Sequence, residues 1–248
     1  MELYKEGMLS NSPIPESIST IIDADVKRSF KNFERIDAES LANILITYAY
    51  HNPEVGYCQG MNFIAGFLYL ILQDESKAFV FLNRIIGKYE MNELYSKNIP
   101  LLKKHFYKMD RLLYMYYPEL TACLRNEGIN SSLFSSTWFI TLFTNSLQAN
   151  DELEPNTFLL AIWDTFLLYG WKAIYKTGLF IIGKLEPQLM KSKFDQMMMT
   201  FTELIKGNSF KEKILSAEFK QRFSEIKLTN ITLELLSKEY KKVTGSNN

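Results

Sequence analysis

Apolar residues recur at helical spacing along almost the whole 248-residue chain, and this pattern constrains the fold more than any other feature. The clearest segment begins after Asp37, which is placed as an N-cap, and ends at Asn52-Pro53. Its apolar residues fall at i, i+3, i+4 and i+7: Leu41, Ile44, Leu45 and Tyr48. No segment alternates convincingly as a strand does. The sequence therefore predicts an all-α fold.

The same spacing predicts ten further helices. They cover approximately 60–72, 75–87, 99–116, 118–127, 131–147, 155–169, 171–190, 193–206, 209–225 and 230–242. Gly87, Gly128, Gly170 and Gly207 are placed like the glycines that follow helices. We expect one helical domain over 1–242, open to division into two subdomains near Asn150-Asp151 or Gly207-Asn208. A disordered tail is expected over 243–248.

Composition and charge exclude several functional classes. Lys plus Arg equals Asp plus Glu at 28 each, so the chain lacks the basic field that draws proteins to nucleic acid or anionic membranes. The longest apolar run, Phe63 to Leu72, is about half of the ~20 residues that span a bilayer, so no transmembrane segment is expected. The N-terminus lacks a signal-peptide pattern, and Cys58 and Cys123 show no disulfide spacing, which predicts a cytoplasmic protein.

Residues for a nucleotide or metal site in this chain are not found. Gly178 to Lys184 reads G-x-x-x-x-G-K, but Leu185 stands where a P-loop needs Ser or Thr for magnesium. The intervening residues continue an apolar helix face, so these glycines are predicted to allow close helix packing. His51 and His105 are the only histidines and lack metal-ligand spacing. No metal or cofactor is expected to bind this chain.

The first motif of interest is I-x-x-D-x-x-R, formed by Ile22, Asp25 and Arg28. On a helix, Ile22 can anchor in the core while the Asp25 carboxylate fixes local backbone or a neighbouring donor. Arg28 then lies at the helix end. Alternatively, Asp25 and Arg28 form a surface ion pair worth only a few tenths of a kcal/mol.

The second motif is Y-x-Q-G, at Tyr57 to Gly60, followed by Asn62. It lies between helix-ending residues and an apolar helix, so it is predicted to be a loop entering a helix. Backbone N–H groups there suit an approaching phosphate, and Gln59 can offer a donor and an acceptor to a water molecule. The alternative is that Gln59 simply caps the helix.

Together, in this order, the two motifs resemble the paired signature of TBC domains, the GTPase-activating domains that act on Rab-type small GTPases. Arg28 and Gln59 lie 31 positions apart, which is similar to the usual family spacing. The helix motif W-F-x-x-L-F at Trp138 to Phe143 and the I-W-D segment at Ile162 to Asp164 also resemble the family. The resemblance is clearest over residues 20–190.

The resemblance implies an activator with no independent catalytic site, which completes the active site of a GTP-bound Rab. Arg28 would be the arginine finger that neutralises charge on the transferring phosphoryl group, and Gln59 the glutamine finger that positions water. GTP and Mg²⁺ would belong to the partner, and the chain would meet membranes only peripherally through partners. A non-catalytic helical module that binds a GTPase or another protein is the alternative.

Supporting roles follow from the same resemblance. Ile22 and Asp25 would support and orient the Arg28 segment, Tyr57 would contact the partner, and Asn62 would brace the loop at Gly60. Two further residues, Trp163 and Asp164, would pack and cap within the helical framework or line the GTPase-binding groove.

The chain departs from the family pattern at a few positions. The Pro and Thr that often flank the arginine are Lys27 and Ser29, and the commoner Val of the second motif is Cys58. The Arg and Trp usual at the domain's beginning are not found before Ser12, which predicts a truncated or divergent N-terminal edge.

Overall fold

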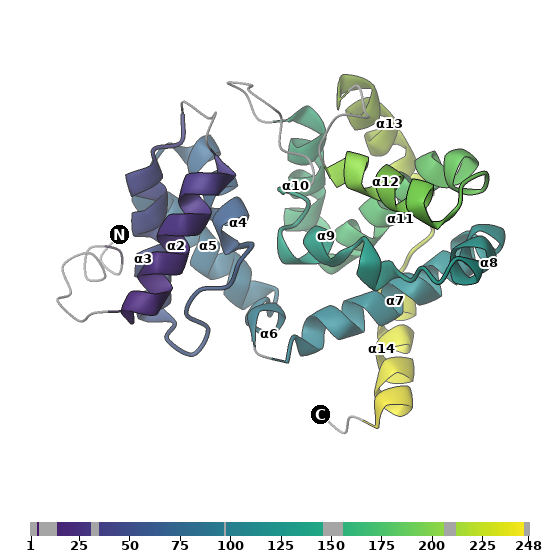
Figure 1. Cartoon of the computed structure of the whole chain (residues 1–248), viewed down its shortest axis with the longest axis horizontal. Helices are drawn as coiled ribbons and strands as arrows, with labels where there is room; N and C mark the ends of the chain where they lie inside the picture. Colours follow the sequence, from purple (N-terminus) through teal and green to yellow (C-terminus); the bar gives the residue numbers. More distant parts are fainter. Residues whose placement is uncertain are drawn as a thin grey trace. The chain divides into compact units, whose positions relative to one another are not determined.

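The chain is helical throughout the part that the computed structural model describes. That part comprises residue 4 and residues 14–30, 35–96, 98–145, 156–205 and 212–245, without the side chains of 204, 205 and 212–215. Within it, α-helices and one short 3-10 helix account for the regular structure, and no strand is present (Figure 1). The all-α prediction is confirmed.

The chain divides into two compact units. The first comprises Met1–Ile99 with Ala149–Pro155, and the second comprises Pro100–Gln148 with Asn156–Asn248. Division into two helical parts agrees with the option left open by the sequence. The two boundaries suggested there, at 150–151 and 207–208, lie outside the described residues.

The first unit contains the two motifs. Its helices are α2 (Glu16–Ser29), α3 (Ala38–His51), α4 (Met61–Leu72), α5 (Glu75–Lys88) and α6 (Asn92–Tyr95). Helices α2 to α5 pack on one another, with α3 in contact with α2, α4 and α5. The Asp37 carboxylate accepts the Ser40 N–H at 2.8 Å, so the predicted N-cap of α3 is confirmed.

Close packing fixes the end of α2 against α4. The Phe30 ring lies where a Cβ on Gly66 would be, so only glycine at that position in α4 admits the ring. Phe30 is buried and its ring also contacts Phe63, at 5.9 Å between centroids. The C-terminus of α2 is thereby held beside the N-terminal half of α4.

The second unit is a larger helical assembly. Its elements are α7 (Pro100–Tyr116), α8 (Pro118–Asn126), η1 (Ser131–Leu133), α9 (Ser136–Ile140), α10 (Thr157–Tyr169), α11 (Trp171–Leu189), α12 (Phe194–Ile205), α13 (Glu212–Glu225) and α14 (Asn230–Thr244). Helix α10 packs against α11 and α13, and α7 packs against α8 and α14.

The G-x-x-x-x-G-K segment lies inside α11, as its apolar pattern predicted. Gly178 faces Met109 and Trp138, and Gly183 faces the Tyr117 hydroxyl so closely that a Cβ would overlap it. Both glycines therefore serve helix packing. The prediction of a packing role is confirmed.

Three boundary predictions were wrong. The segment predicted as one helix over 131–147 consists, over its described residues 131–145, of η1, α9 and a turn in which Leu142 and Phe143 take positive φ values of 50° and 65°. Gly87 lies within α5 rather than after it. Helix α14 extends through Thr244 to a left-handed Gly245, past the predicted end at residue 242. Gly207, Ser12 and residues 246–248 lie outside the described residues.

Candidate functional site

The second half of α2 carries the first motif. Ile22 is fully buried and Asp25 nearly so, whereas Arg28 has 54% of its side chain exposed. The Arg28 guanidinium forms an ion pair with the Asp25 carboxylate, with 2.6 Å between Nη2 and Oδ1. The predicted anchor, carboxylate and helix-end arginine are therefore all found. The i, i+3 ion pair of the alternative is therefore present, but it does not lie wholly on the surface, because the Asp25 side chain is only 5% exposed.

The loop before α4 presents the second motif. Gly60 takes φ 109° and ψ −26° directly before the helix, a left-handed conformation that glycine adopts most readily. The Met61 N–H returns to the Cys58 carbonyl at 3.1 Å, which closes a tight turn around Gln59. This turn is the predicted loop entering a helix.

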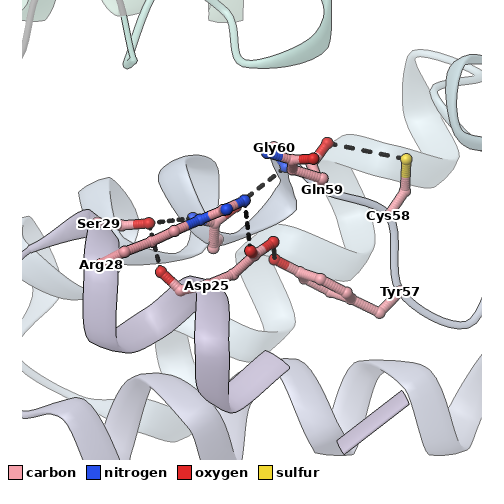
Figure 2. Close-up of polar contacts among 8 residues, drawn as sticks. Asp25, Arg28, Ser29, Tyr57, Cys58, Gln59 and Gly60 are labelled. Atoms are coloured by element: carbon pink, nitrogen blue, oxygen red, sulfur yellow. Dashed lines mark hydrogen bonds and ion pairs between the residues drawn. The ribbon is translucent and has the colours of Figure 1, made fainter. Parts of the chain in front are cut away.

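A hydrogen bond joins the two motifs. The Tyr57 hydroxyl donates to Asp25 Oδ2 at 2.7 Å, while Asp25 Oδ1 faces Arg28. Figure 2 shows Asp25, Arg28 and Ser29 on α2 and Tyr57 to Gly60 on the facing loop. One buried carboxylate therefore fixes the helix carrying Arg28 relative to the loop carrying Gln59. Tyr57, expected to contact a partner, here packs inward on Asp25.

Gln59 is exposed at the tip of this turn. Helix α4 has no side-chain N-cap hydrogen bond, so the alternative that Gln59 caps it is wrong. Only the backbone carbonyl of Gln59 has a partner among the described residues, a long contact of 3.8 Å from the Cys58 thiol. Its amide group is thus available to other molecules.

Four backbone N–H groups of this loop have partners within it, and the suitability of the loop for an approaching phosphate stays a prediction. The Cys58 N–H faces the Met61 sulfur at 3.2 Å, and the Gly60 N–H donates to Asn62 Oδ1 at 3.0 Å. The Met61 and Phe63 N–H groups are used by the turn itself. These four donors stabilise the loop.

Asn62 braces the loop, as the resemblance implied, through its bond with Gly60. It also makes a contact that could not be predicted from the sequence: its amide donates to the Ser29 hydroxyl at 2.5 Å. Ser29 was noted only as a departure beside Arg28. No sequence spacing connects two polar residues 33 positions apart.

Burial sets the protonation of the groups around Asp25. Burial first, and then the hydrogen bond to Asp25, raise the pKa of Tyr57 far above its usual range, so the phenol remains a donor. Burial and the Asp25 charge also raise the pKa of the Cys58 thiol. Cys58 is therefore a thiol at neutral pH and lacks the thiolate that nucleophilic chemistry needs.

Trp163 and Asp164 belong to the second unit and have different environments. Trp163 is 4% exposed and packs edge-on against Phe166 at 6.2 Å, so its predicted packing role is confirmed. Asp164 is exposed in the middle of α10, whose N-cap is Asn156. The prediction that Asp164 caps a helix is wrong.

The described part of the chain has neither a metal-binding cluster nor a helix that could span a membrane. There, no group of three or more His, Cys, Asp or Glu residues is placed to hold a metal ion. Within the same ranges, no helix combines the length and apolarity required to cross a membrane. Arg28 and Gln59, on two segments joined by the Tyr57–Asp25 hydrogen bond, remain the strongest candidate site.

Comparison with known proteins matches the chain to a family. The family model described as the Rab-GTPase-TBC domain matches residues 2–190. The chain is 32% identical over 212 residues to growth hormone-regulated TBC protein 1 of Xenopus tropicalis, covering 82% of this chain and 60% of that protein. It is 32% identical over 198 residues to GTPase-activating protein GYP5 of Saccharomyces cerevisiae, covering 80% of this chain and 21% of that protein. The chain thus spans less than two thirds of these relatives.

Solved structures share the fold. The flagellar RabGAP TBC domain of Chlamydomonas superimposes with a TM-score of 0.69 at 21% identity, covering 87% of this chain and 69% of that one. The Ypt/Rab-GAP domain of Gyp1p gives a TM-score of 0.68 at 18% identity, covering 97% of this chain and 79% of that one. With the family model matching most of its length, the chain belongs to the Rab-GTPase-TBC domain family.

Proposed function

We propose that this chain accelerates GTP hydrolysis by a Rab-type small GTPase, supplying Arg28 as an arginine finger and Gln59 as a glutamine finger. The observation that carries the proposal is the Tyr57–Asp25 hydrogen bond, which joins the segments bearing these two exposed side chains. Membership of the family and the GTPase-activating protein GYP5 among the relatives support the same activity.

The chemistry asks little of the activator beyond these two groups. Charge develops on the oxygens of the transferring phosphoryl group, and an arginine supplied in trans is worth roughly 10³ to 10⁵ in rate. The Gln59 amide can donate to one partner and accept from a water, which suits it to orient the attacking water. The nucleotide and Mg²⁺ would be held by the GTPase, so the chain acts as an activator without a catalytic centre of its own.

Asp25 prepares Arg28 for this role. A buried carboxylate that already holds the guanidinium reduces the side-chain entropy lost when the arginine enters another protein's active site. More than half of the Arg28 side chain is exposed, so a partner can reach the guanidinium without disturbing the core. Since Tyr57 also donates to Asp25, the carboxylate keeps a partner when the arginine engages.

A Rab partner also suggests where the chain works. We propose that it acts in vesicle trafficking, in the cytoplasm and at endomembranes, and is brought there by its partners.

The test is single-turnover hydrolysis across a panel of GTP-loaded Rab proteins. We expect acceleration of at least one, a loss of about 10³-fold or more in Arg28→Ala, and a large loss in Gln59→Ala. Arg28→Lys keeps the charge but loses the planar fork, so it should recover only part of the rate. Lys27→Ala, which removes the neighbouring exposed cation, is the matched control and should retain full activity.

Two results would contradict the proposal. Full activity in both Arg28→Ala and Gln59→Ala would show that these side chains are not the fingers. Binding of GTP-loaded Rab in a pull-down, without acceleration of any member of the panel, would favour the non-catalytic binding module instead.

A further inference from the structure

The hydroxyl of Ser29 has two partners, which distinguishes it from other serines of the same helix. It donates to the Asp25 carbonyl at 2.5 Å and accepts from the Asn62 amide at 2.5 Å. The first bond is local and common: Ser19 and Thr20 make the equivalent bond to the Glu16 carbonyl. The second bond crosses from α2 to α4.

The direction of every bond in this chain is fixed. The Gly60 N–H can only donate, so the Asn62 oxygen must face it and the Asn62 NH₂ must face Ser29. The Ser29 oxygen therefore accepts, and its single proton is left for the Asp25 carbonyl. Gly60, Asn62, Ser29 and Asp25 thus form one continuous chain of hydrogen bonds with a single arrangement of protons.

This chain is a second link between the segments that the Tyr57–Asp25 bond already joins. On α2, the linked residues Asp25 and Ser29 flank Arg28, and in the loop the linked residues Tyr57 and Gly60 flank Gln59 (Figure 2). Two links at separate points oppose rotation of one segment about the other, which a single link would permit. The two exposed side chains lie between the linked points.

We propose that Ser29 is a positioning residue, which sets the distance and orientation between Arg28 and Gln59 through Asn62 and Gly60. The inference rests on the proposed function, since it assigns a role within that pair of fingers. Reactions that depend on two groups acting on one phosphoryl centre are sensitive to small displacements, and a shift of about 1 Å can cost 10²-fold in rate. Ser29 would therefore influence turnover more than binding.

The variant that tests this is Ser29→Ala, measured for kcat and KM on the GTP-loaded Rab that responds best. We expect kcat to fall about 10- to 100-fold while KM changes less than about threefold. Ser29→Thr keeps the hydroxyl and should restore most of kcat. Ser19→Ala removes an equivalent hydroxyl bonded only to its own helix and should leave both constants unchanged.

A second measurement separates positioning from a general loss of structure. In a Gln59→Ala background the placement of Gln59 no longer matters, so adding Ser29→Ala should change kcat less than about threefold. If Ser29 merely stabilised the fold, its replacement would lower activity by the same factor in both backgrounds. Thermal unfolding of each variant shows whether the proteins compared are folded.

The outcomes distinguish this inference from the proposed function. If Arg28→Ala and Gln59→Ala abolish acceleration but Ser29→Ala retains full kcat, the inference is overturned and the proposed function stands. An effect of Ser29→Ala confined to KM, or an equal loss in the Gln59→Ala background, also overturns it. If wild-type protein accelerates no Rab in the panel, the proposed function fails and the inference fails with it.

Discussion

Asp25 shows how one buried residue can organise an exposed site. Its carboxylate holds Arg28 with one oxygen and Tyr57 with the other, and its backbone carbonyl accepts Ser29. A carboxylate this deeply buried is costly unless it is paired and hydrogen-bonded, so these contacts stabilise the charge as well as the geometry. The same contacts determine where Arg28 can reach.

Replacing Tyr57 by Phe removes the donor to Asp25 while keeping the ring. Hydrogen bonds to charged groups contribute roughly 1.5–3 kcal/mol, so we expect the free energy of unfolding to fall by about that amount. The rate of GTPase activation should also fall, because one link between the Arg28 and Gln59 segments is lost. Urea unfolding and single-turnover hydrolysis measure the two effects.

The control for this variant is Tyr50→Phe in α3. Tyr50 is likewise half-buried, and its hydroxyl makes no hydrogen bond to a described residue. Its replacement should leave stability and activity within experimental error. Equal unfolding free energies for wild type and Tyr57→Phe would show that the Asp25–Tyr57 bond contributes nothing to the fold.

The sequence predicted Ile22, Asp25 and the loop at Gly60 well, because each depends on local periodicity or glycine chemistry. The finger roles of Arg28 and Gln59 came only from family resemblance and stay predictions. The Ser29–Asn62 bond was not foreseen, since it is created by packing of α2 on α4 and leaves no periodic mark in the sequence. Long-range polar pairs are found only when the fold is known.

At the scale of elements, prediction succeeded where capping and periodicity agree. Helix α3 begins after Asp37, and its predicted apolar face is buried. The segment over 131–147 failed because Trp138 stacks on Phe143 at 5.3 Å, within a turn that brings two left-handed residues into the core. Aromatic packing there outweighs the tendency of the apolar pattern to form a helix. The strength of that packing cannot be judged from residue spacing.

Two helical glycines should respond in opposite directions to the same substitution. A Cβ on Gly87 in α5 would meet no atom within 4 Å, so Gly87→Ala should stabilise the protein by about 0.5 kcal/mol through higher helix propensity. A Cβ on Gly183 in α11 would overlap the Tyr117 hydroxyl, which donates to the Leu179 carbonyl at 3.0 Å. Gly183→Ala should therefore destabilise by about 1–3 kcal/mol despite the same gain in propensity.

Chemical unfolding of both variants gives the comparison, and each serves as the control for the other. The sign matters more than the size, because it reports whether the space beside each glycine is open or filled. Stabilisation by Gly183→Ala would show that Tyr117 moves aside freely and that α11 is not closely packed there.

For the molecule as a whole, the division into two units was foreseen only as an option. The units change at three places along the chain, and the one at Ile99–Pro100, where composition does not change, was not foreseen. The helical region is disfavoured for the residue before a proline, and Ile99 takes a positive φ of 42°, so the chain does not continue there as one helix. The sequence shows the proline, but only the contacts show that two cores separate at this point.

The balance of charge over the whole molecule predicts how it would meet the proposed Rab partner. With 28 basic and 28 acidic residues the chain has no net charge, so long-range attraction between it and a charged GTPase is weak. Exposed charges farther apart than about 10 Å are screened from one another at 0.1 M salt. The charge of Arg28 is therefore expected to attract a partner only at short range. We therefore expect kcat/KM for stimulated GTP hydrolysis to change less than about threefold between roughly 0.05 and 0.3 M salt. Over the same range, the rates of electrostatically steered associations fall steeply. The matched comparison is a variant carrying Lys103→Glu, Lys238→Glu and Lys242→Glu, which gives the chain a net negative charge and should make kcat/KM depend measurably on salt. A steep salt dependence of the wild type would instead require a local charged surface to guide the encounter.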